Sequence, residues 1–320
     1  MHSTLSAVET IAFWMLTSVL GLATVTLQFS NDNTFPLAVA HALAGYLWLA
    51  VVPLILWSAV ASSRPRVGAA VVVFACTLAW VAPGHVPTTP RGEPELRLAS
   101  ANVLMVHQDP DRVIADLVTQ DPDLIVLQEI SHQWADAIEH SDALEAWPHR
   151  LIHPLDGSFG VAVLSKVPLH MTIEDLAGIP MAKVELTLNG QRIDVYDVHT
   201  LPPRSDDYAA IWSEQMTLLA DRVRTSPVPV ILAGDFNATR HHPSYKRLTG
   251  AGLNDAHAQV GRASAKTWPN GLFPVPSLRL DHVLVGDGIT VHAVAEGPAN
   301  GSDHKPLFVD LGWDGPLRGS

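Results

Sequence analysis

Residues 228–237 have the sequence VPVILAGDFN, an apolar run that ends in two polar side chains. The segment Val228–Leu232 has the length and the branched apolar content of a strand buried on both faces. Gly234 permits an unusual backbone path, so Asp235 and Asn237, two positions apart, can face one cavity. Taken alone, an acid and an amide after a strand are also typical of a plain turn. The stretch therefore predicts a buried strand that delivers polar groups to a site or to solvent.

Similar strand ends recur over the last two thirds of the chain. They are Asn102 in SANVL, Glu129 in LIVLQEI, His199 in VYDVHT, Asp281 in RLDHVLV, and Asp303 and His304 in GSDHKPL. Each places an acid, an amide or a histidine at the rim of a sheet, where functional groups are usually gathered. Several such rims together predict a metal-dependent site that cleaves phosphate esters.

The region from Glu95 onward alternates strand-like and helix-like segments. Strands are predicted over residues 96–104, 124–127, 159–164, 182–188, 192–198, 228–232, 281–285, 289–295 and 307–311, and helices over residues 109–120, 131–146, 206–224 and 243–248. Asn189-Gly190 joins two of these strands and is the strongest short hairpin signal. Because hairpins are mixed with strand–helix units, the order favours an α/β (α+β) fold with sheets packed on each other and helices outside.

Charge is distributed unevenly along the 320 residues. Residues 1–90 contain four charged side chains, namely Glu9, Asp32, Arg64 and Arg66. The remainder therefore holds 18 of the 20 Lys and Arg and 30 of the 32 Asp and Glu, and 18 − 30 accounts for the whole net charge of −12. The charge-poor part consists of three apolar stretches, at about residues 9–29, 35–61 and 67–82. A membrane-spanning helix needs about 20 apolar residues, so the sequence predicts three transmembrane helices.

These stretches define the expected domains. A membrane domain at residues 1–83 is followed by a Pro- and Gly-rich linker at 84–94 and a catalytic domain at 95–320. The alternatives are a cleaved signal peptide for the first stretch and a soluble helix bundle for all three. MHSTLSAVET lacks Lys and Arg, which disfavours a signal peptide. The near absence of charge on any helix face disfavours a soluble bundle.

The positive-inside tendency gives an orientation. The segment Ser62–Arg66 carries two arginines, whereas Ser30–Thr34 carries none, so the former is expected in the cytoplasm. With three spans, the N-terminus then lies inside and the large domain outside. Arg91 and Arg97 follow the third stretch and argue for the opposite orientation. We expect a multi-pass protein of the cell membrane with an extracytoplasmic catalytic domain.

The acidic and imidazole groups suit chemistry on phosphate. Mg²⁺ prefers oxygen ligands and typically takes one or two carboxylates, which Glu129 and Asp303 could supply, although either acid could simply be solvated. An aspartate beside His304 would fix its tautomer and favour its charged form. Neither GxSxG, a P-loop nor the HExxH spacing of a zinc site occurs. With no evident nucleophilic serine, direct attack by water is favoured over a covalent intermediate.

Considered together, the motifs resemble the endonuclease/exonuclease/phosphatase superfamily, and in particular a membrane-anchored bacterial type. This fold is shared by deoxyribonuclease I, abasic-site endonucleases, sphingomyelinases and inositol polyphosphate 5-phosphatases. The resemblance covers about Leu96 to Leu311. It is carried by SANVL, LQEI, GVAVLSK at 160–166, DVHT, GDFN, the turn Thr267-Trp268-Pro269, LDHVL and SDHKPL, in the family's order. It implies a four-layer αββα sandwich.

The resemblance also implies roles for individual residues. Glu129 would be the main Mg²⁺ ligand, with Asn102 and Asp303 near the metal and Mn²⁺ as an alternative ion. Among the catalytic residues, Asp235 would position or deprotonate the attacking water, or assist the leaving oxygen. Asn237 would hold the phosphate, and His199 and His304 would donate hydrogen bonds to the phosphate oxygens. Asp281 or Asp303 would orient His304. The chain departs from some members by lacking a basic residue after Glu129, and no carboxylate partner for His199 is identified.

Three functions remain open. A phosphatase or pyrophosphatase acting on a lipid-linked or small phosphate fits the predicted anchor, because anchoring raises the effective concentration on a membrane. Apolar residues Trp268, Leu272, Phe273 and Val275 could face an acyl or prenyl chain, or could serve local packing. A nuclease is disfavoured because nucleic-acid binding relies on Lys and Arg, whereas this domain is acidic. The third is a catalytically silent, membrane-anchored binding module.

Overall fold

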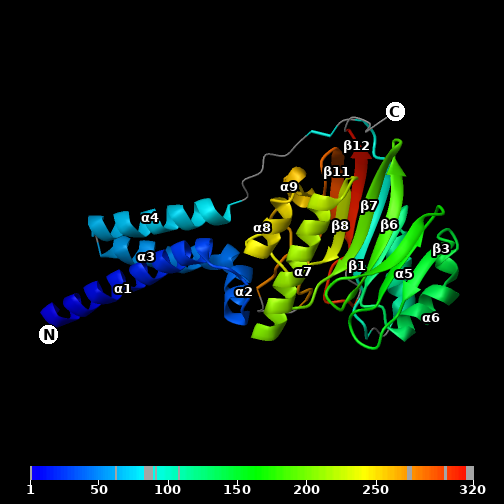
Figure 1. Ribbon diagram of the computed structural model, residues 1–320. Helices are drawn as coiled ribbons and strands as arrows, with labels where there is room; N and C mark the ends of the chain where they lie inside the picture. Colours follow the sequence, from blue (N-terminus) through cyan, green and yellow to red (C-terminus); the bar gives the residue numbers. More distant parts are fainter. Residues whose placement is uncertain are drawn as a thin grey trace.

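Two six-stranded sheets lie face to face after residue 95, and helices cover the outer face of each (Figure 1). This computed structural model describes residues 2–61, 63–82, 89–90, 92–106, 109–271, 276–298 and 301–314. The first sheet has the order β11-β12-β1-β2-β4-β3, and the second has the order β5-β6-β7-β8-β10-β9.

The bounds of the elements are as follows. The first sheet comprises β11 Ile289–Glu296, β12 Leu307–Trp313, β1 Leu96–Asn102, β2 Leu124–Gln128, β4 Val161–Ser165 and β3 His149–His153. The second comprises β5 His170–Asp175, β6 Pro180–Leu188, β7 Gln191–His199, β8 Val230–Asp235, β10 Asp281–Val285 and β9 Asn254–Asp255. The helices of this region are α5 Pro110–Val118, α6 His132–His140, η2 Asp142–Leu144, α7 Asp206–Thr225, α8 Pro243–Thr249 and α9 Ala256–Gln259.

Three apolar cores separate the four layers. Along β2, Leu124 and Val126 pack between the two sheets, whereas Ile125 and Leu127 pack under α5 and α6. A third core joins the second sheet to α7 and α8. Because both faces of the central strands are covered, their sequences are continuous apolar runs. The predicted four-layer αββα sandwich is thus confirmed.

Three edge strands were not predicted, namely β3, β5 and the two-residue β9. Every residue of β3 is half-buried, and every residue of β5 is exposed or half-buried. Both lie at sheet edges, where one side of the strand has no partner within the sheet. Their polar sequences, HRLIH and HMTIED, therefore lack the apolar run of a central strand. The helix predicted over residues 131–146 ends at His140, and a separate 3-10 turn follows it.

Apolar helices precede the sandwich. They are α1 His2–Phe29, α2 Phe35–Ala42, η1 Ala44–Tyr46, α3 Leu47–Val60 and α4 Arg64–Val81. Among the described residues, α1 and α4 are each long and apolar enough to cross a membrane. A third crossing requires that α2 and residues 44–60, which are bent by 43°, count as one span. In Figure 1, α1, α3 and α4 extend together away from the sandwich, whereas α2 lies at the junction.

The second apolar stretch bends because α2 packs on the sandwich. Ala38 is buried in the core beneath α7 and α8. The carbonyl of Ala38 accepts a hydrogen bond from His242 Nε2 at 2.9 Å. The predicted single helix over residues 35–61 is therefore divided into α2, η1 and α3. The predicted linker at residues 84–94 lies largely outside the described residues, and the domain boundaries stay a prediction.

We expect Gly234→Ala to disrupt the sandwich beside the site. Gly234 has a φ of +143°, and an added Cβ would lie 1.9 Å from the carbonyl oxygen of Val198 on β7. Overpacking of this kind against backbone should cost about 3 kcal/mol or more. At Gly178, also at positive φ, a Cβ would meet nothing within 4 Å, so Gly178→Ala should cost only about 1–2 kcal/mol. Thermal unfolding of both variants measures the difference, and equal losses would contradict this account.

Candidate active site

Strand register places three of the predicted site residues in a row. The parallel pairing of β7 with β8 sets His199 opposite Asp235. The antiparallel pairing of β8 with β10 sets Asp281 opposite the same aspartate. All three side chains are buried. Directly opposed residues on neighbouring strands lie about 5 Å apart, so the end of β8 lies at the centre of the site.

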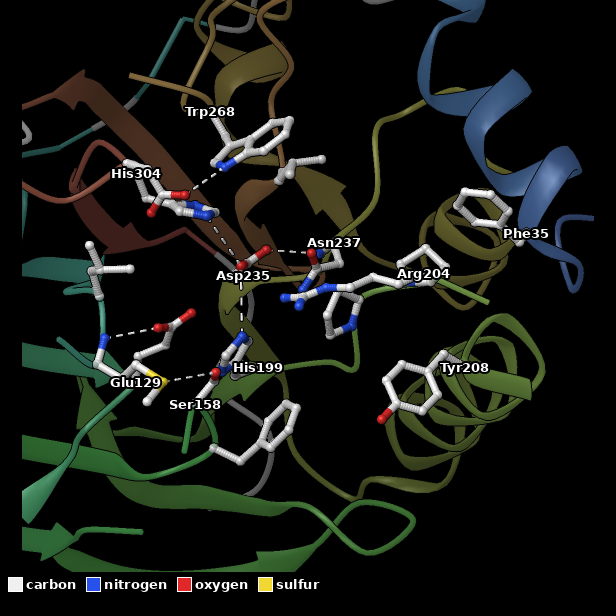
Figure 2. A pocket seen from close by; sticks show the side chains of 17 residues that line it. Phe35, Glu129, Ser158, His199, Arg204, Tyr208, Asp235, Asn237, Trp268 and His304 are labelled. Atoms are coloured by element: carbon white, nitrogen blue, oxygen red, sulfur yellow. Dashed lines mark hydrogen bonds and ion pairs between the residues drawn. The ribbon is translucent and has the colours of Figure 1, made fainter. Parts of the chain in front are cut away.

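His304 joins this row from the loop before β12. Its Nδ1 lies 2.9 Å from Asp281 Oδ2. Its Nε2 lies 3.7 Å from Asp235 Oδ2, and His199 Nε2 lies 3.8 Å from the same oxygen. Figure 2 shows the two imidazoles on opposite sides of Asp235. One carboxylate oxygen is thus flanked by two histidines, of which one is held by a second carboxylate.

Asn102 links the two sheets at this point. Its Nδ2 donates to Glu129 Oε1 at 3.0 Å and to Asp235 Oδ2 at 3.2 Å. Glu129 Oε2 also accepts a hydrogen bond from the Met105 N–H at 2.9 Å. The backbone of Glu129 has a φ of +67°, in the left-handed region that costs energy for a non-glycine residue. This turn after β2 presents the Glu129 carboxylate to the cavity instead of continuing the strand.

Asp303 and Asn237 are held by neighbouring loops. Asp303 Oδ2 accepts from Trp268 Nε1 at 3.0 Å. Asn237, with a φ of +49°, donates its backbone N–H to Asp235 Oδ1 at 2.8 Å and its Nδ2 to the carbonyl of Thr200 at 2.9 Å. These bonds fix both side chains without placing either in the apolar core.

A cavity of about 830 Å³ opens over these groups (Figure 2). Six of the eight predicted site residues line it: Glu129, His199, Asp235, Asn237, Asp303 and His304. Asn102 and Asp281 lie behind them and contact the cavity only through their hydrogen-bonded partners. The structure therefore brings all eight predicted residues to one site, while their chemical roles stay predictions.

The cavity also includes residues that the sequence analysis did not select. They are Phe35, Leu104, Met105, Ser158, Phe159, Pro202, Pro203, Arg204, Tyr208 and Leu280. Most come from loops or from α2, and no strand-end pattern marks them. Trp268, for which the sequence left a substrate contact and local packing open, lines the cavity, whereas Leu272, Phe273 and Val275 lie outside the described residues.

A buried polar pair behind the site was also missed. Gln128 Nε2 donates to Asp197 Oδ1 at 2.5 Å across the two sheets. Burial raises the pKa of Asp197 well above its ordinary value, although this hydrogen bond opposes the shift. Gln128, next to Glu129, and Asp197, two residues before His199, thus join the two sheets behind the site.

Burial and neighbouring charges give the two histidines opposite protonation states. For His304, burial would lower the pKa, but Asp281 and Asp235 raise it to about 10. For His199, burial together with the nearby charge of His304 lowers the pKa to about 4. Burial and Asp281 raise the pKa of Asp235 to about 7 against the opposing effect of His304. At neutral pH, therefore, His304 is a cation and His199 is neutral.

Two sets of residues could be considered for a metal ion. The ligand atoms of Asp235, Asp281 and His304 lie within 4.8 Å of one another. However, His304 Nδ1 is hydrogen-bonded to Asp281 Oδ2, and Asp235 Oδ2 accepts a hydrogen bond from Asn102 Nδ2, so a metal ion at this place would have to replace these bonds. Glu129 and Asp303 are half-buried carboxylates that line the open cavity, which suits a hard cation that keeps several waters. The donor set of Glu129 and Asp303 therefore fits Mg²⁺ better.

Comparison with known proteins supports the class that this fold and site define. The sequence profile of the Endonuclease/Exonuclease/phosphatase family matches residues 99–304. The chain belongs to this family, whose members hydrolyse phosphate esters and typically use a divalent metal. This membership confirms the superfamily that the sequence motifs indicated.

Individual relatives are more distant. The Uncharacterized protein YbhP of Escherichia coli (strain K12) is 27% identical over 227 residues, covering 60% of this chain and 84% of the relative. D. rerio TDP2 complexed with a single-strand DNA product has a TM-score of 0.58 at 17% identity, covering 68% of this chain and 98% of that one. The 3′ phosphatase NExo from Neisseria, bound to a product DNA hairpin, has a TM-score of 0.53 at 17% identity, covering 68% and 100%. At these identities the structural likeness establishes the fold.

The pKa of His304 provides a direct test of this geometry. Asp281 is the largest of the contributions that raise it to about 10, so Asp281→Asn should bring it down toward the ordinary value of about 6.5. NMR titration of the histidine ring signals of the metal-free protein measures the change, and the His304→Gln variant assigns the signal. In that variant the pKa of His199 should rise above about 4, because a neighbouring positive charge is removed. An unchanged His304 pKa in Asp281→Asn would contradict the pairing of His304 with Asp281.

Proposed function

We propose that the protein is a membrane-anchored, Mg²⁺-dependent phosphoesterase that hydrolyses phosphate ester or pyrophosphate bonds of a lipid-linked or small substrate. The observation that carries the proposal is the buried Asp235 carboxylate between His199 and His304, at the floor of a cavity that Glu129 also lines. This arrangement supports attack by water, because the described part of the cavity presents a base and two imidazoles to one reacting centre.

Metal binding is assigned to the open side of the cavity. Glu129 and Asp303 would hold Mg²⁺, or Mn²⁺ as an alternative, and Asn102 would orient Glu129 through its amide. A divalent cation bound there would supply Lewis acidity toward the phosphoryl oxygens. Trp268 would keep Asp303 in place through its Nε1–H.

The remaining residues act on the water and the phosphate. Asp235 would accept the proton of the attacking water, because its pKa near 7 leaves it partly ionised at neutral pH. The charged His304, oriented by Asp281, would donate to a phosphoryl oxygen as negative charge builds, and the neutral His199 would donate beside it. Asn237, fixed by Thr200 and Asp235, would complete phosphate binding.

The cavity wall supports a substrate with an apolar part. Among the described lining residues, Arg204 is the sole Lys or Arg, whereas Phe35, Phe159, Tyr208 and Trp268 supply aromatic surface. Binding along a nucleic acid would need several cations to meet successive phosphates. A nuclease is nevertheless the second candidate, because D. rerio TDP2 and the Neisseria enzyme were solved with DNA products. The filled set of polar positions disfavours a silent binding module.

We further propose that α1, α4 and the bent pair of α2 and α3 anchor the protein in the cell membrane. The start of α1, the end of α3 and the start of α4 lie at the end of the helices that is far from the sandwich (Figure 1). This arrangement supports an odd number of crossings. Arg64 and Arg66 at the start of α4 would then lie in the cytoplasm, with the catalytic domain outside.

Substrate class is tested with two reactions in Mg²⁺. The full-length protein in detergent should release phosphate from farnesyl pyrophosphate and leave plasmid DNA intact. We expect this result because one cavity arginine can bind a compact phosphate group but cannot follow a DNA backbone. Cleavage of DNA without release of phosphate would establish the nuclease instead. Absence of both reactions at saturating Mg²⁺ and Mn²⁺ would favour the silent module.

Two variants distinguish the two candidate groups of metal ligands. Glu129→Gln should weaken activation by Mg²⁺ by more than about 10–100-fold, the loss that follows when only a residue supporting a metal ligand is changed. Asp235→Asn should lower kcat about 10²–10⁴-fold, as expected for loss of a general base, with the half-saturating Mg²⁺ concentration unchanged. Glu139→Gln, at an exposed position on α6, is the control and should match the wild type. A large shift in Mg²⁺ dependence for Asp235→Asn would instead place the metal among Asp235, Asp281 and His304.

A further inference from the structure

The segment between α1 and α3 is bound to the sandwich by specific polar contacts. The buried carboxylate of Asp32 accepts hydrogen bonds from Ser244 N at 2.8 Å and from Ser244 Oγ at 2.7 Å. The N–H of Phe35 donates to Asp206 Oδ1 at 2.8 Å. Asp32 thus caps the first turn of α8, and α2 begins against the first turn of α7. These contacts hold α2 in a fixed position relative to the catalytic residues.

The first residue of α2 contributes to the catalytic cavity. Phe35 lines it together with Arg204 and Tyr208. Figure 2 shows Arg204 directed toward Asn237 and Asp235, with the rings of Phe35 and Tyr208 farther from the catalytic centre. The two rings are 41% and 46% exposed, so they offer apolar surface at the mouth. The cavity therefore changes from polar at its floor to aromatic at this side.

Basic and aromatic residues lie at the junction between the apolar helices and the sandwich. Lys246 lies over the Trp80 ring at 5.8 Å, and Lys266 lies over the Tyr46 ring at 5.1 Å. Arg240 donates to the carbonyl of Val81 at the end of α4. Aromatic and basic side chains gather where a membrane meets water. Because these residues surround the ends of η1 and α4 that face the sandwich, the headgroup layer would lie at the level of the junction.

The exposed face of α2 continues this surface. Val39 lies one turn after Phe35 on the same side of α2, Leu43 follows the last residue of the helix, and each is 39% exposed. An apolar helix face that directly follows a candidate span has a bilayer as its natural neighbour. The mouth of the cavity therefore adjoins the membrane surface through the side that carries Phe35.

We propose that the membrane segment supplies one wall of the active site, and that Phe35 and Tyr208 select substrates by holding the apolar chain next to the phosphate. This inference rests on the proposed phosphoesterase function and adds to it the residues that determine chain preference. The substrate would enter from the adjoining bilayer with its phosphate toward Asp235 and its chain between the two rings.

The test compares two substrates with the same reacting group and different chains. Farnesyl pyrophosphate and isopentenyl pyrophosphate are hydrolysed by the full-length protein in detergent. Phe35→Ala and Tyr208→Ala should each lower kcat/KM for the farnesyl compound about 10-fold or more, chiefly through KM, because buried aromatic contact is lost. The value for the isopentenyl compound should change less than about twofold, which also shows that the variants fold. Phe35→Leu should restore most of the farnesyl value.

A control and the opposing outcomes complete the experiment. Leu218→Ala removes an equally exposed apolar side chain of α7 that does not line the cavity, and it should leave both substrates unaffected. Equal losses for the two substrates, or no loss for either, in Phe35→Ala and Tyr208→Ala would overturn the inference while leaving the phosphoesterase standing. Failure of the wild type to hydrolyse either pyrophosphate would overturn the proposed function, and this inference with it.

Discussion

The pairing of β8 with β7 on one side and β10 on the other is the constraint on which the site depends. It sets His199, Asp235 and Asp281 in one row. A shift of one residue in either register would turn a side chain to the opposite face of the sheet. Gly234 allows the close approach of β7 that this register needs, since a Cβ there would collide with Val198. The first sheet contributes Asn102 and Glu129, which lie beside Asp235 at the same end of the sandwich.

Electrostatics follow from this geometry. Asp281 and Asp235 raise the pKa of His304 even though burial opposes ionisation, and the resulting cation helps to lower the pKa of His199. One imidazolium, one imidazole and one partly ionised carboxyl therefore share a small buried region. Such preset charges and donors require little reorganisation when charge develops on a substrate, which is why sites of this kind can be effective. The carboxylates of Glu129 and Asp303, where we propose that the metal binds, lie on the open side of the cavity, apart from this buried group.

The apolar N-terminal helices and the sandwich form a connected structure. Asp32, buried against Ser244, and Ala38, packed beneath α7 and α8, hold α2 on the sandwich. As a result, Phe35 belongs both to the apolar segment and to the cavity. The net charge of −12 and the aromatic side of the cavity both favour one class of substrate, a compact phosphate group attached to an apolar chain. They disfavour a nucleic acid as the substrate.

The sequence by itself determined the layered fold and the strand-end residues of the site. Buried strands such as Leu124–Gln128 are apolar on both faces, and this pattern is local. Edge strand β5, the bend between α2 and α3, and the cavity residues Phe35 and Arg204 were decided only by tertiary structure. The apolar pattern of an edge strand depends on which segments cover it. The chain bends between α2 and α3 because Ala38 and Asp32 contact α7 and α8, more than 150 residues away in the sequence. Contacts over that separation leave no local pattern in the sequence, whereas a strand covered on both faces leaves a continuous apolar run.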